Sequence, residues 1–394
     1  MKILLVLSEE YPGFSAGAKH AQLLARGLTA NKVDVTVIGF GGGDQSQGLD
    51  EYGVKFRADT SYKLHRGLFA YIHKVLHYRV SIAKIVNECL MVDGGDAVIY
   101  HGRSWWGVSL LRGVCKAHGA KLVPFQMEWF PFEWLRFGNG SLIDQWLFRR
   151  LTLPNCDGMI GISHFWKTWA NQRNLKCVVA PALIGDPIAV STRTTKEISP
   201  FTIVYAGKWA RRELIFTILK ALKLVITRGV KAKLVVVGNI GTSAIARHAM
   251  EMLKRTPELQ NSVEFTGWVS EAKLDELFVG ADAFVLLRTD SRETDALFPT
   301  RLPEYLASGN PVILSRVKEM EYYFEHEDSV LFISPGDHPD ELADAICYLQ
   351  NCPESKRKIG LRGREVCTER FDYKLIGERI QNFIQSLVAS GVST

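Results

Sequence analysis

Short apolar runs alternate with segments of helical periodicity along most of the chain. Residues 2–7 form an unbroken apolar run, typical of a central parallel strand, and residues 18–28 place Ala21, Leu24 and Leu28 on one helical face. Further strands are predicted over residues 33–40, 97–100, 121–125, 159–162 and 178–180. This alternation predicts an α/β fold with a parallel sheet that is covered by helices on both faces.

The pattern stops between residues 184 and 200, where residues 191–196 are polar and without period. We interpret this segment as an interdomain linker, because the alternation restarts after it. Strands are predicted over residues 202–206, 233–237, 263–265, 283–287, 311–314 and 330–333, and helices over residues 213–227, 244–254, 271–279, 302–308, 339–349 and 354–366.

The sequence therefore predicts two α/β domains, residues 1–190 and residues 191–372. A last amphipathic helix, residues 373–388, is followed by no strand. We expect it to return to the first domain, so that residues 373–394 belong there.

Length and composition agree with two globular domains. The chain has 394 residues, of which 47% are hydrophobic and 23% charged. The formal net charge of +6 is too weak to indicate a nucleic-acid partner, and none is expected. Such a charge suits an anionic substrate or an anionic membrane surface.

The cysteines and the beginning of the chain favour a cytoplasmic protein. Seven cysteines are scattered without a Cys-x-x-Cys pair, so free thiols are expected rather than disulfides or a zinc site. The first apolar run is too short for a signal peptide and is followed by Glu9 and Glu10. No apolar stretch of about 18 residues occurs, so no membrane span is expected.

Ligands of parallel sheets bind at the carboxyl ends of the strands, so the loops after the predicted strands hold the candidate residues. In the first loop, residues 10–18, Gly17 lets a ligand approach a helix N-terminus, although a simple tight turn is the alternative. This loop matches neither a dinucleotide fingerprint nor a P-loop. Residues 39–44 are also glycine-rich, but no amphipathic helix follows, which favours a turn.

Residues 298–313 form the strongest pattern: a loop, a short helix, a glycine stop and a strand. The helix begins near Thr300 and Leu302, where free amides and the helix dipole favour a bound diphosphate. Glu304 lies one turn inside, where its carboxylate can accept hydrogen bonds from ribose hydroxyls.

A second candidate segment follows the strand that ends at residue 206 and opens a helix. It contains Gly207 and Lys208, and the adjacent arginines Arg211 and Arg212. Lys208 with one of the two arginines is suited to neutralise a leaving diphosphate.

These segments resemble the retaining GT-B glycosyltransferases of family 4, also called glycosyl transferases group 1. In that family a strand ending in glycine is followed by a basic pair, which Lys208 and Arg212 resemble, with Arg211 competing for the second place. The family's late motif ends in a glutamate and Ala-x-Gly-x-Pro-Val-Ile. Glu304 matches the glutamate, and the tail reads Ala-Ser-Gly-Asn-Pro-Val-Ile over residues 307–313.

The chain departs from the family at one motif position. The motif's first glutamate falls on Ala296, and the adjacent Asp295 is the candidate substitute. Residues 298–305 are similar to a Phe-Pro-x-Lys-Leu-x-Glu-Tyr variant of the motif, with Arg301 for the lysine. Residues 263–269, which include Gly267, look like the family's segment beside the nucleotide base.

The resemblance implies two Rossmann-like domains that face each other across a cleft and transfer a sugar with retention of configuration. The donor is a nucleoside-diphosphate sugar, with UDP and GDP favoured by resemblance alone. The protein's task is then to stabilise the departing diphosphate and to position the acceptor hydroxyl. No Asp-x-Asp occurs in the chain, so we expect no metal and no other cofactor.

The acceptor side is predicted in the first domain, where His101 and Glu128 follow strands. Glu128 is a candidate for orienting the acceptor or the transferred sugar, and His101 for contacting the acceptor. A structural role is the alternative for both. Arg288 follows the strand at residues 283–287 and is either a donor ligand or a salt-bridged loop residue.

Two stretches mix basic and aromatic residues, residues 62–85 and residues 129–151. Such stretches suit peripheral contact with an anionic bilayer, and a glycan or lipid-linked acceptor would agree with that. An ordinary amphipathic helix packed on the core is the alternative. The resulting hypothesis is a cytoplasmic enzyme of cell-surface polysaccharide or glycoconjugate synthesis, peripheral at the inner face of the membrane.

Other functions stay open at this level. A nucleotide-sugar epimerase shares the fold, but the basic pair and residues 298–305 favour the transferase. Ala296 keeps open a non-catalytic relative that binds a nucleotide sugar or glycan as a partner subunit. A nicotinamide-dependent dehydrogenase is disfavoured because no Gly-x-Gly-x-x-Gly occurs.

Overall fold

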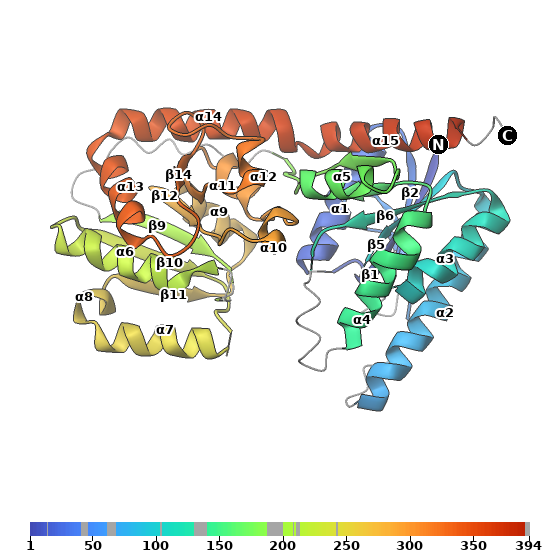
Figure 1. The fold of residues 1–394 in the computed structure, drawn as a ribbon, viewed down its shortest axis with the longest axis horizontal. Helices are drawn as coiled ribbons and strands as arrows, with labels where there is room; N and C mark the ends of the chain where they lie inside the picture. The colour runs from blue at the N-terminus through green and yellow to red at the C-terminus, as the bar shows by residue number, and fades with distance from the viewer. Residues whose placement is uncertain are drawn as a thin grey trace. The chain divides into compact units, whose positions relative to one another are not determined.

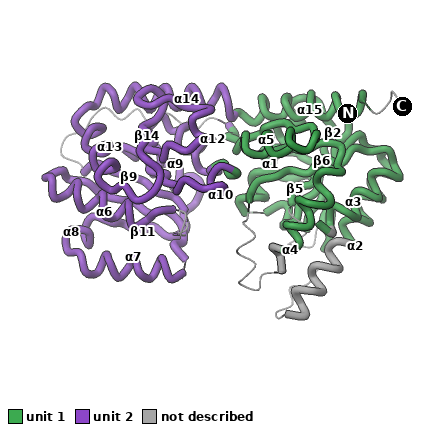
Figure 2. The backbone as a smooth tube through the Cα atoms, viewed as in Figure 1, with its two compact units in different colours: residues 1–185, 296–298, 372–394 green, residues 186–295, 299–371 purple. Residues whose placement is uncertain are grey.

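The computed structural model describes residues 1–13, 15–40, 46–60, 68–102, 105–129, 140–186, 200–207, 209, 213–241 and 243–390. For residues 68–79, 106 and 140–142 it describes the backbone alone. Two compact units are present (Figure 2). Unit 1 comprises Met1–Gly185, Ala296–Phe298 and Asp372–Thr394, and unit 2 comprises Asp186–Asp295 and Pro299–Phe371. No pattern in the sequence indicated that residues 296–298 group with unit 1.

In the described part of unit 1, eight strands form one sheet in the order β3-β4-β2-β1-β5-β6-β7-β8. Figure 1 labels four of them, β1, β2, β5 and β6. All neighbours are parallel except β3, which runs antiparallel to β4 at the edge. The strands are β1 (Lys2–Glu10), β2 (Asp34–Phe40), β3 (Gln47–Leu49), β4 (Lys55–Asp59), β5 (Ala97–His101), β6 (Lys121–Gln126), β7 (Met159–Gly161) and β8 (Cys177–Val179).

The strand order of this sheet reverses beside β1. The chain goes from β1 to β2 and β4 on one side, then returns to place β5 on the other side of β1. Ile3 pairs with both Val35 of β2 and Ala97 of β5, so β1 is central and its core residues are fully buried. The crevice at such a switch point is where open α/β sheets bind ligands.

The last helix packs on the first helix of unit 1. Gly27 of α1 and Gly377 of α15 meet so closely that a Cβ at Gly27 would lie 2.1 Å from the Tyr373 carbonyl oxygen. The expected return of the C-terminal helix is therefore confirmed. The helices are α1 (Ala16–Ala30), α2 (Leu68–Asp93), α3 (Trp105–His118), α4 (Gly140–Leu147), η2 (Phe148–Thr152), η3 (Leu153–Asn155), α5 (His164–Asn171) and α15 (Tyr373–Ala389).

In unit 2, six described strands form a wholly parallel sheet in the order β11-β10-β9-β12-β13-β14. The strands are β9 (Phe201–Ala206), β10 (Ala232–Val237), β11 (Val263–Gly267), β12 (Ala283–Leu286), β13 (Val312–Ser315) and β14 (Leu331–Ile333). The order reverses between β9 and β12, which are neighbours in the sheet. The second switch point therefore lies at the carboxyl ends of β9 and β12.

A continuous apolar core joins the unit 2 sheet to its helices, with α6 and α13 packed against each other. Ile218 and Leu222 of α6 are 2% and 1% exposed because they point at the sheet at helical spacing. The helices are α6 (Ile215–Thr227), α7 (Ala244–Arg255), α8 (Pro257–Gln260), α9 (Glu271–Val279), α10 (Arg292–Asp295), α11 (Leu302–Ala307), α12 (Lys318–Glu321), α13 (Pro339–Asn351) and α14 (Pro353–Phe371).

Two parallel α/β sheets confirm the predicted fold class. The predicted strands are present, with ends that move by one to three residues. The pattern missed β3 and β4, which are short edge strands with mixed burial, and α3, which begins with two tryptophans. The predicted linker over residues 191–196 lies outside the described residues.

Candidate functional site

The switch point of unit 2 brings together residues from three strand ends. Gly207 follows β9, Arg288 follows β12, and Ser315 ends β13. The Arg288 backbone is held from both sides: its N–H donates to Ser315 Oγ at 2.9 Å, and its carbonyl oxygen accepts from Gly336 N at 3.1 Å. The root of the Arg288 side chain is thus fixed at the carboxyl edge of the sheet.

Arg288 forms a largely buried ion pair with Glu213. Arg288 Nη1 lies 2.7 Å from Glu213 Oε2, and the two side chains are 13% and 18% exposed. The Tyr205 hydroxyl also donates to Glu213 Oε2, at 3.3 Å. Burial, and then the Glu213 charge, raises the pKa of Tyr205, which keeps its phenol protonated as a donor. Of the two interpretations left open for Arg288, the ion pair is present in this structure.

Glycines open the carboxyl edge of the sheet around this pair. Gly207, with a φ of 155°, lies over the Tyr205 hydroxyl, 3.3 Å from where its Cβ would be. Gly267 has a φ of 66°, and no atom lies within 4 Å of a Cβ built there. Its carbonyl accepts from Gly238 N at 2.9 Å, which ties the ends of β10 and β11 together. A ligand can therefore approach the backbone at Gly267, whereas the space beside Gly207 is taken by the Tyr205 ring.

Helix α11 is tied to the end of β9 through Tyr305. The backbone N–H of Ala206 donates to the Tyr305 hydroxyl at 2.7 Å, and the Tyr305 ring stacks on Phe284 with ring centroids 4.3 Å apart. Glu304 precedes Tyr305 in the first turn of α11. Glu304 forms an ion pair with Arg301, and its side chain remains 33% exposed.

The start of α11 differs from the expected anion site. The Leu302 amide donates to the Pro299 carbonyl at 3.1 Å, and Pro303 has no N–H to offer. Leu302 is fully buried, whereas Thr300 is exposed. The preceding turn therefore uses the Leu302 amide, and the binding of a diphosphate at the start of α11 stays a prediction.

Asp295 ends α10 with a carboxyl group that is partly buried. Its Oδ1 is buried without a hydrogen-bond partner among the described residues. Burial first, and then the charge of Asp290, raises the pKa of this carboxyl above its usual range. A carboxyl in such an environment suits a reactive position, but its proposed substitution for the motif's first glutamate stays a prediction. Ala296 is fully buried, and its carbonyl accepts from Trp166 Nε1 at 3.0 Å within unit 1.

Lys208, Arg211 and Arg212 lie outside the described residues. Their predicted contact with the donor diphosphate stays a prediction.

In unit 1, the N-terminus of α1 receives a carboxylate of the chain itself. The Ser15 hydroxyl donates to Glu9 Oε2, while Ser15 Oγ accepts from Ala18 N at 3.0 Å as the helix cap. A Cβ at Gly17 would lie 2.5 Å from Glu9 Oε1. Gly17 therefore makes room for the Glu9 side chain, and its predicted contact with the donor stays a prediction.

The switch point of unit 1 contains a pair of buried histidines. His101 ends β5 and lies with its Nε2 3.2 Å from Nδ1 of His20 on α1. The two side chains are 4% and 5% exposed, and both rings pack on Phe125 at the end of β6. Burial, followed by the neighbouring His101, lowers the pKa of His20 well below its ordinary value, so His20 is neutral near pH 7. His101 thus uses Nε2 within the protein, which restricts its predicted contact with an acceptor.

Glu128 follows β6 by two residues and is partly exposed. Its position at the carboxyl end of the sheet agrees with the prediction, and its role with the acceptor stays a prediction.

Sequence reasoning missed His20 and Glu213. His20 shares the helical spacing of Ala21, Leu24 and Leu28, so a polar residue facing the sheet was a readable signal. Glu213 directly follows the basic segment and precedes a helix. The signal there was an acidic residue beside a predicted anion site.

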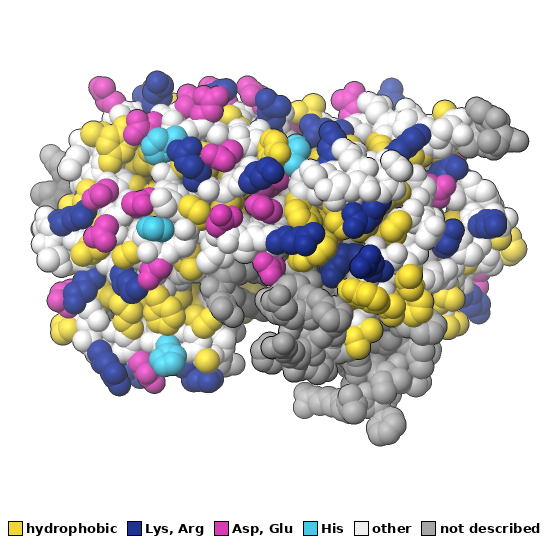
Figure 3. All heavy atoms as spheres, viewed as in Figure 1, with side chains coloured by type: hydrophobic (Ala, Val, Ile, Leu, Met, Phe, Trp, Pro, Cys, Tyr) yellow, Lys and Arg dark blue, Asp and Glu magenta, His cyan; other side chains and the backbone are white. Residues whose placement is uncertain are grey.

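Exposed apolar and basic side chains adjoin on unit 1 over α3, α4 and η2, which contact one another. Figure 3 shows them side by side over the region where Figure 1 draws α3 and α4. The apolar members are Leu110, Ile143, Trp146 and Leu151, which are 39%, 51%, 37% and 52% exposed. The basic members are Arg112, Lys116 and Arg150, all of them exposed. We call these seven residues the α3–α4 surface.

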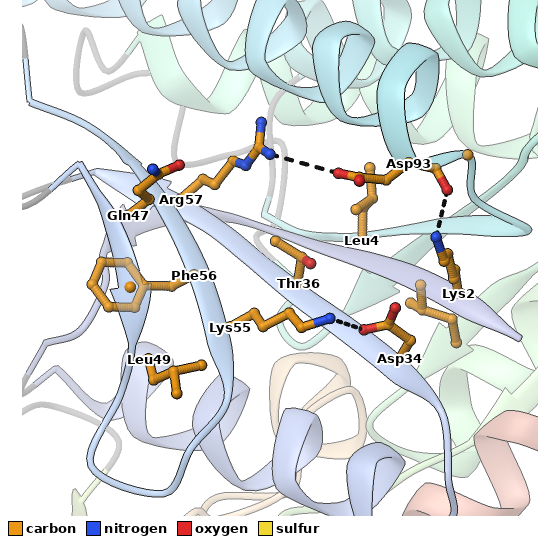
Figure 4. Close-up of a pocket in the computed structure, with 13 residues that line it drawn as sticks. Lys2, Leu4, Asp34, Thr36, Gln47, Leu49, Lys55, Phe56, Arg57 and Asp93 are labelled. Atoms are coloured by element: carbon orange, nitrogen blue, oxygen red, sulfur yellow. Dashed lines mark hydrogen bonds and ion pairs between the residues drawn. The ribbon is translucent and has the colours of Figure 1, made fainter.

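A pocket of about 580 Å³ lies at the opposite, amino ends of β1, β2 and β4 (Figure 4). Its cations are already paired: Lys55 Nζ lies 2.8 Å from Asp34 Oδ1, and Arg57 Nη2 lies 3.6 Å from Asp93 Oδ2. Lys2 Nζ donates to the Asp93 carbonyl at 2.6 Å. Because these cations already have partners and the pocket lies away from the carboxyl edge, this pocket is not the candidate site.

Within the described ranges, no group of three or more His, Cys, Asp and Glu side chains is placed to hold a metal ion. None of the described helices is long and apolar enough to cross a membrane.

The two doubly wound sheets define the GT-B class of fold, and solved structures agree over nearly the whole chain. A glycosyltransferase from Rickettsia africae ESF-5 is 16% identical with a TM-score of 0.73, over 98% of each chain. Sucrose-phosphate synthase from Thermosynechococcus elongatus is 15% identical with a TM-score of 0.73, over 99% of this chain and 100% of its own. HepE of Anabaena, solved with UDP, is 16% identical with a TM-score of 0.70, over 98% and 100%.

Residues 200–351 match the family model described as glycosyl transferases group 1. No curated protein sequence matches the chain. Within unit 2, residues 200–351 are therefore similar to a group 1 glycosyltransferase domain, and the chain has the GT-B fold. The fold and this match over part of the chain are the basis on which an activity is proposed below.

Proposed function

We propose that the chain moves a sugar, with retention of configuration, from a UDP- or GDP-sugar to a glycan or lipid-linked acceptor without a metal ion. The observation that carries this proposal is the switch point of unit 2, where Gly207 and Arg288 follow β9 and β12 within the region that matches the family model. Glu304 lies in the same region of the sequence. A guanidinium and an open glycine edge suit a diphosphate, and Glu304 suits the ribose hydroxyls.

The mechanism is electrostatic. The bond between the sugar's anomeric carbon and the diphosphate oxygen breaks while the bond to the acceptor oxygen forms on the same face. Positive charge develops on the sugar ring and negative charge on the leaving diphosphate. Arg288, together with Lys208 and Arg211 or Arg212, stabilises that negative charge, and the departing phosphate accepts the acceptor's proton.

The experiment that tests the donor site is a thermal-shift screen against UDP, GDP, ADP, TDP and CMP, with and without EDTA. A ligand that binds the folded state raises the melting temperature. We expect one diphosphate to stabilise the wild type regardless of EDTA and to lose its effect in Glu304→Ala. If none of them stabilises the wild type, the nucleotide-sugar proposal fails, and a partner-subunit role becomes the better explanation. NMR of the product's anomeric proton then tests retention.

We further propose that the enzyme is cytoplasmic and docks on an anionic membrane face through the α3–α4 surface, in cell-surface polysaccharide or glycoconjugate synthesis. Two proteins of similar fold are HepE of Anabaena, which is solved with UDP-glucose, and WaaB, a lipopolysaccharide outer core galactosyltransferase. Support comes from the neighbouring apolar and basic side chains, which suit lipid tails and headgroups respectively.

Co-sedimentation with vesicles of anionic and of neutral lipid at low salt tests the docking. The variant Arg150→Glu with Leu151→Ala alters the α3–α4 surface. Its matched control, Arg357→Glu with Leu361→Ala, alters an exposed face of α14 in unit 2. We expect the first variant to lose binding to anionic vesicles and the second to keep it. Equal binding by both variants, or none by the wild type, would refute docking through this surface.

A further inference from the structure

The ion pair of Arg288 and Glu213 lies at the switch point of unit 2, which is where sheets of this topology bind ligands. Arg288 follows β12 and Glu213 follows β9, and these two strands flank the switch point. The pair is 13% and 18% exposed, so it is shielded from bulk water without being closed off. Shielding strengthens the interaction of a guanidinium with any anion that reaches it.

Arg288 has hydrogen-bonding capacity to spare. Its Nη1 donates to Glu213 Oε2 and to the Leu287 carbonyl, both at 2.7 Å. A guanidinium has five N–H groups, and the remaining three, on Nε and Nη2, have no partner among the described residues. These nitrogens are also absent from the fully buried polar atoms, so a ligand can reach them. A planar pair of donors of this kind fits two oxygens of one phosphate group.

Glu213 is itself held in place. The Tyr205 hydroxyl donates to it from β9, and the next residue, Leu214, adopts φ 47° and ψ 40° just before α6. A leucine in the left-handed region is unusual, and such strain concentrates where neighbouring structure must hold a functional geometry. The chain turns at Leu214 so that Glu213 points back at Arg288, instead of continuing the helix.

We propose that Glu213 is a positioning residue of the donor site, which holds Arg288 so that its free N–H groups bind the diphosphate of the nucleotide donor. This inference rests on the proposed function. An unrestrained arginine has many rotamers and would lose that freedom on binding. Glu213 fixes the Arg288 side chain before the nucleotide donor binds, and it leaves Nε and Nη2 of Arg288 available for hydrogen bonds. The guanidinium N–H groups of Arg288 are then already oriented to donate hydrogen bonds to the diphosphate oxygens.

The test compares UDP with uridine, which lacks the phosphates, by titration of the full chain. Arg288→Ala should weaken UDP binding by about tenfold or more, because it removes charge-assisted hydrogen bonds, and should leave uridine binding unchanged. Glu213→Ala and Glu213→Gln should weaken UDP by roughly three- to tenfold, again without an effect on uridine. The double variant Glu213→Ala with Arg288→Ala should bind UDP as Arg288→Ala does, since Glu213 acts through Arg288.

The chain provides a matched control at the other end of β12. Lys356 Nζ lies 2.8 Å from Asp282 Oδ1, and the two side chains are 23% and 22% exposed. Asp282 precedes β12, so this similarly shielded ion pair lies at the amino end of the same strand. Lys356→Ala should lower the melting temperature and leave the affinity for UDP unchanged. Arg288→Lys, which retains the charge but not the fork of donors, should bind UDP with intermediate affinity.

The outcomes separate this inference from the proposed function. If Glu213→Ala binds UDP more tightly, Glu213 competes with the phosphate and the inference is overturned. It is also overturned if Arg288→Ala binds UDP normally, or if the losses of the two single variants add in the double variant. If the folded wild type binds no nucleoside diphosphate at all, the proposed function falls, and the inference falls with it.

Discussion

At the switch point of unit 1, His20 and His101 pack against Phe125 and are 5% and 4% exposed. At the switch point of unit 2, Glu213 and Arg288 form an ion pair that is 18% and 13% exposed, under a glycine edge. The topology of the two places is the same, because in both the strand order reverses beside the first strand. The chemistry differs: unit 1 has a neutral His20 in a packed cluster of rings, and unit 2 has an ion pair that is largely buried but still partly exposed. The fold thus indicates where a ligand binds, and the side chains at that place determine whether a charged group is available to bind it.

The largest expected effect tests whether the unit 1 switch point is a packed core. Phe125→Ala should lower the free energy of unfolding by about 3–5 kcal/mol, because it leaves a cavity under both histidine rings. Urea titration followed by far-UV circular dichroism measures this. A loss below about 1 kcal/mol would mean that the ring is not part of a packed core.

The next effect tests whether the unit 2 switch point is a binding site. Glu304→Ala should weaken UDP binding by about 10- to 100-fold, since a carboxylate that accepts hydrogen bonds contributes about 1.5–3 kcal/mol. Isothermal titration measures it, and Arg301→Ala is the matched control for the ion pair. If both variants lose UDP equally, the pair with Arg301, and not the carboxylate alone, is what the ligand requires.

A pH titration distinguishes the two places by sign. The pKa of His20 is depressed below its ordinary value of 6.5 in the folded protein, so the unfolded chain takes up a proton first as the pH falls. His20 therefore contributes a loss of stability that begins near pH 6.5 and grows toward its folded pKa, at no more than about 1.4 kcal/mol per pH unit. Melting temperatures at pH 7.5, 6.5 and 5.5 should fall less steeply for His20→Gln than for the wild type. Parallel curves would contradict the buried neutral state of His20, whose ring faces the titratable ring of His101.

The smallest effect concerns the rim of the unit 2 switch point. Asp337 Oδ2 lies 2.7 Å from Lys220 Nζ, and its Oδ1 accepts from Thr217 Oγ1 at 2.7 Å. The hydrogen bond from Lys220, followed by that from Thr217, lowers the pKa of Asp337. The side chains are 45% and 55% exposed, so Lys220→Ala should cost about 0–1 kcal/mol. A loss above about 2 kcal/mol in thermal unfolding would show that this rim supports the site more than its exposure implies.

Much of the fold was readable from the chain. Parallel strands buried on both faces read as unbroken apolar runs, as residues 2–7 and 202–206 do, and each was followed by a helical period. The strands β3 and β4 were not predicted, because a short and partly exposed strand has no unbroken apolar run. The site was readable in part: Gly207, Arg288 and Glu304 stand at strand ends or helix starts. No local pattern shows that the turn before α11 uses the Leu302 amide.

By itself, the sequence determined the class of fold, the order of the elements and the segments that carry the donor chemistry, because periodicity and motif spacing are local properties of the chain. Only the tertiary structure decided which of those residues meet. The Glu9 side chain lies against Gly17 at the start of α1. The contacts between His20 and His101 and between Glu213 and Arg288 join residues that are 81 and 75 positions apart in the sequence. Pairing over such separations depends on strand order and register, and these are decided by the burial of the whole sheet rather than by any one segment.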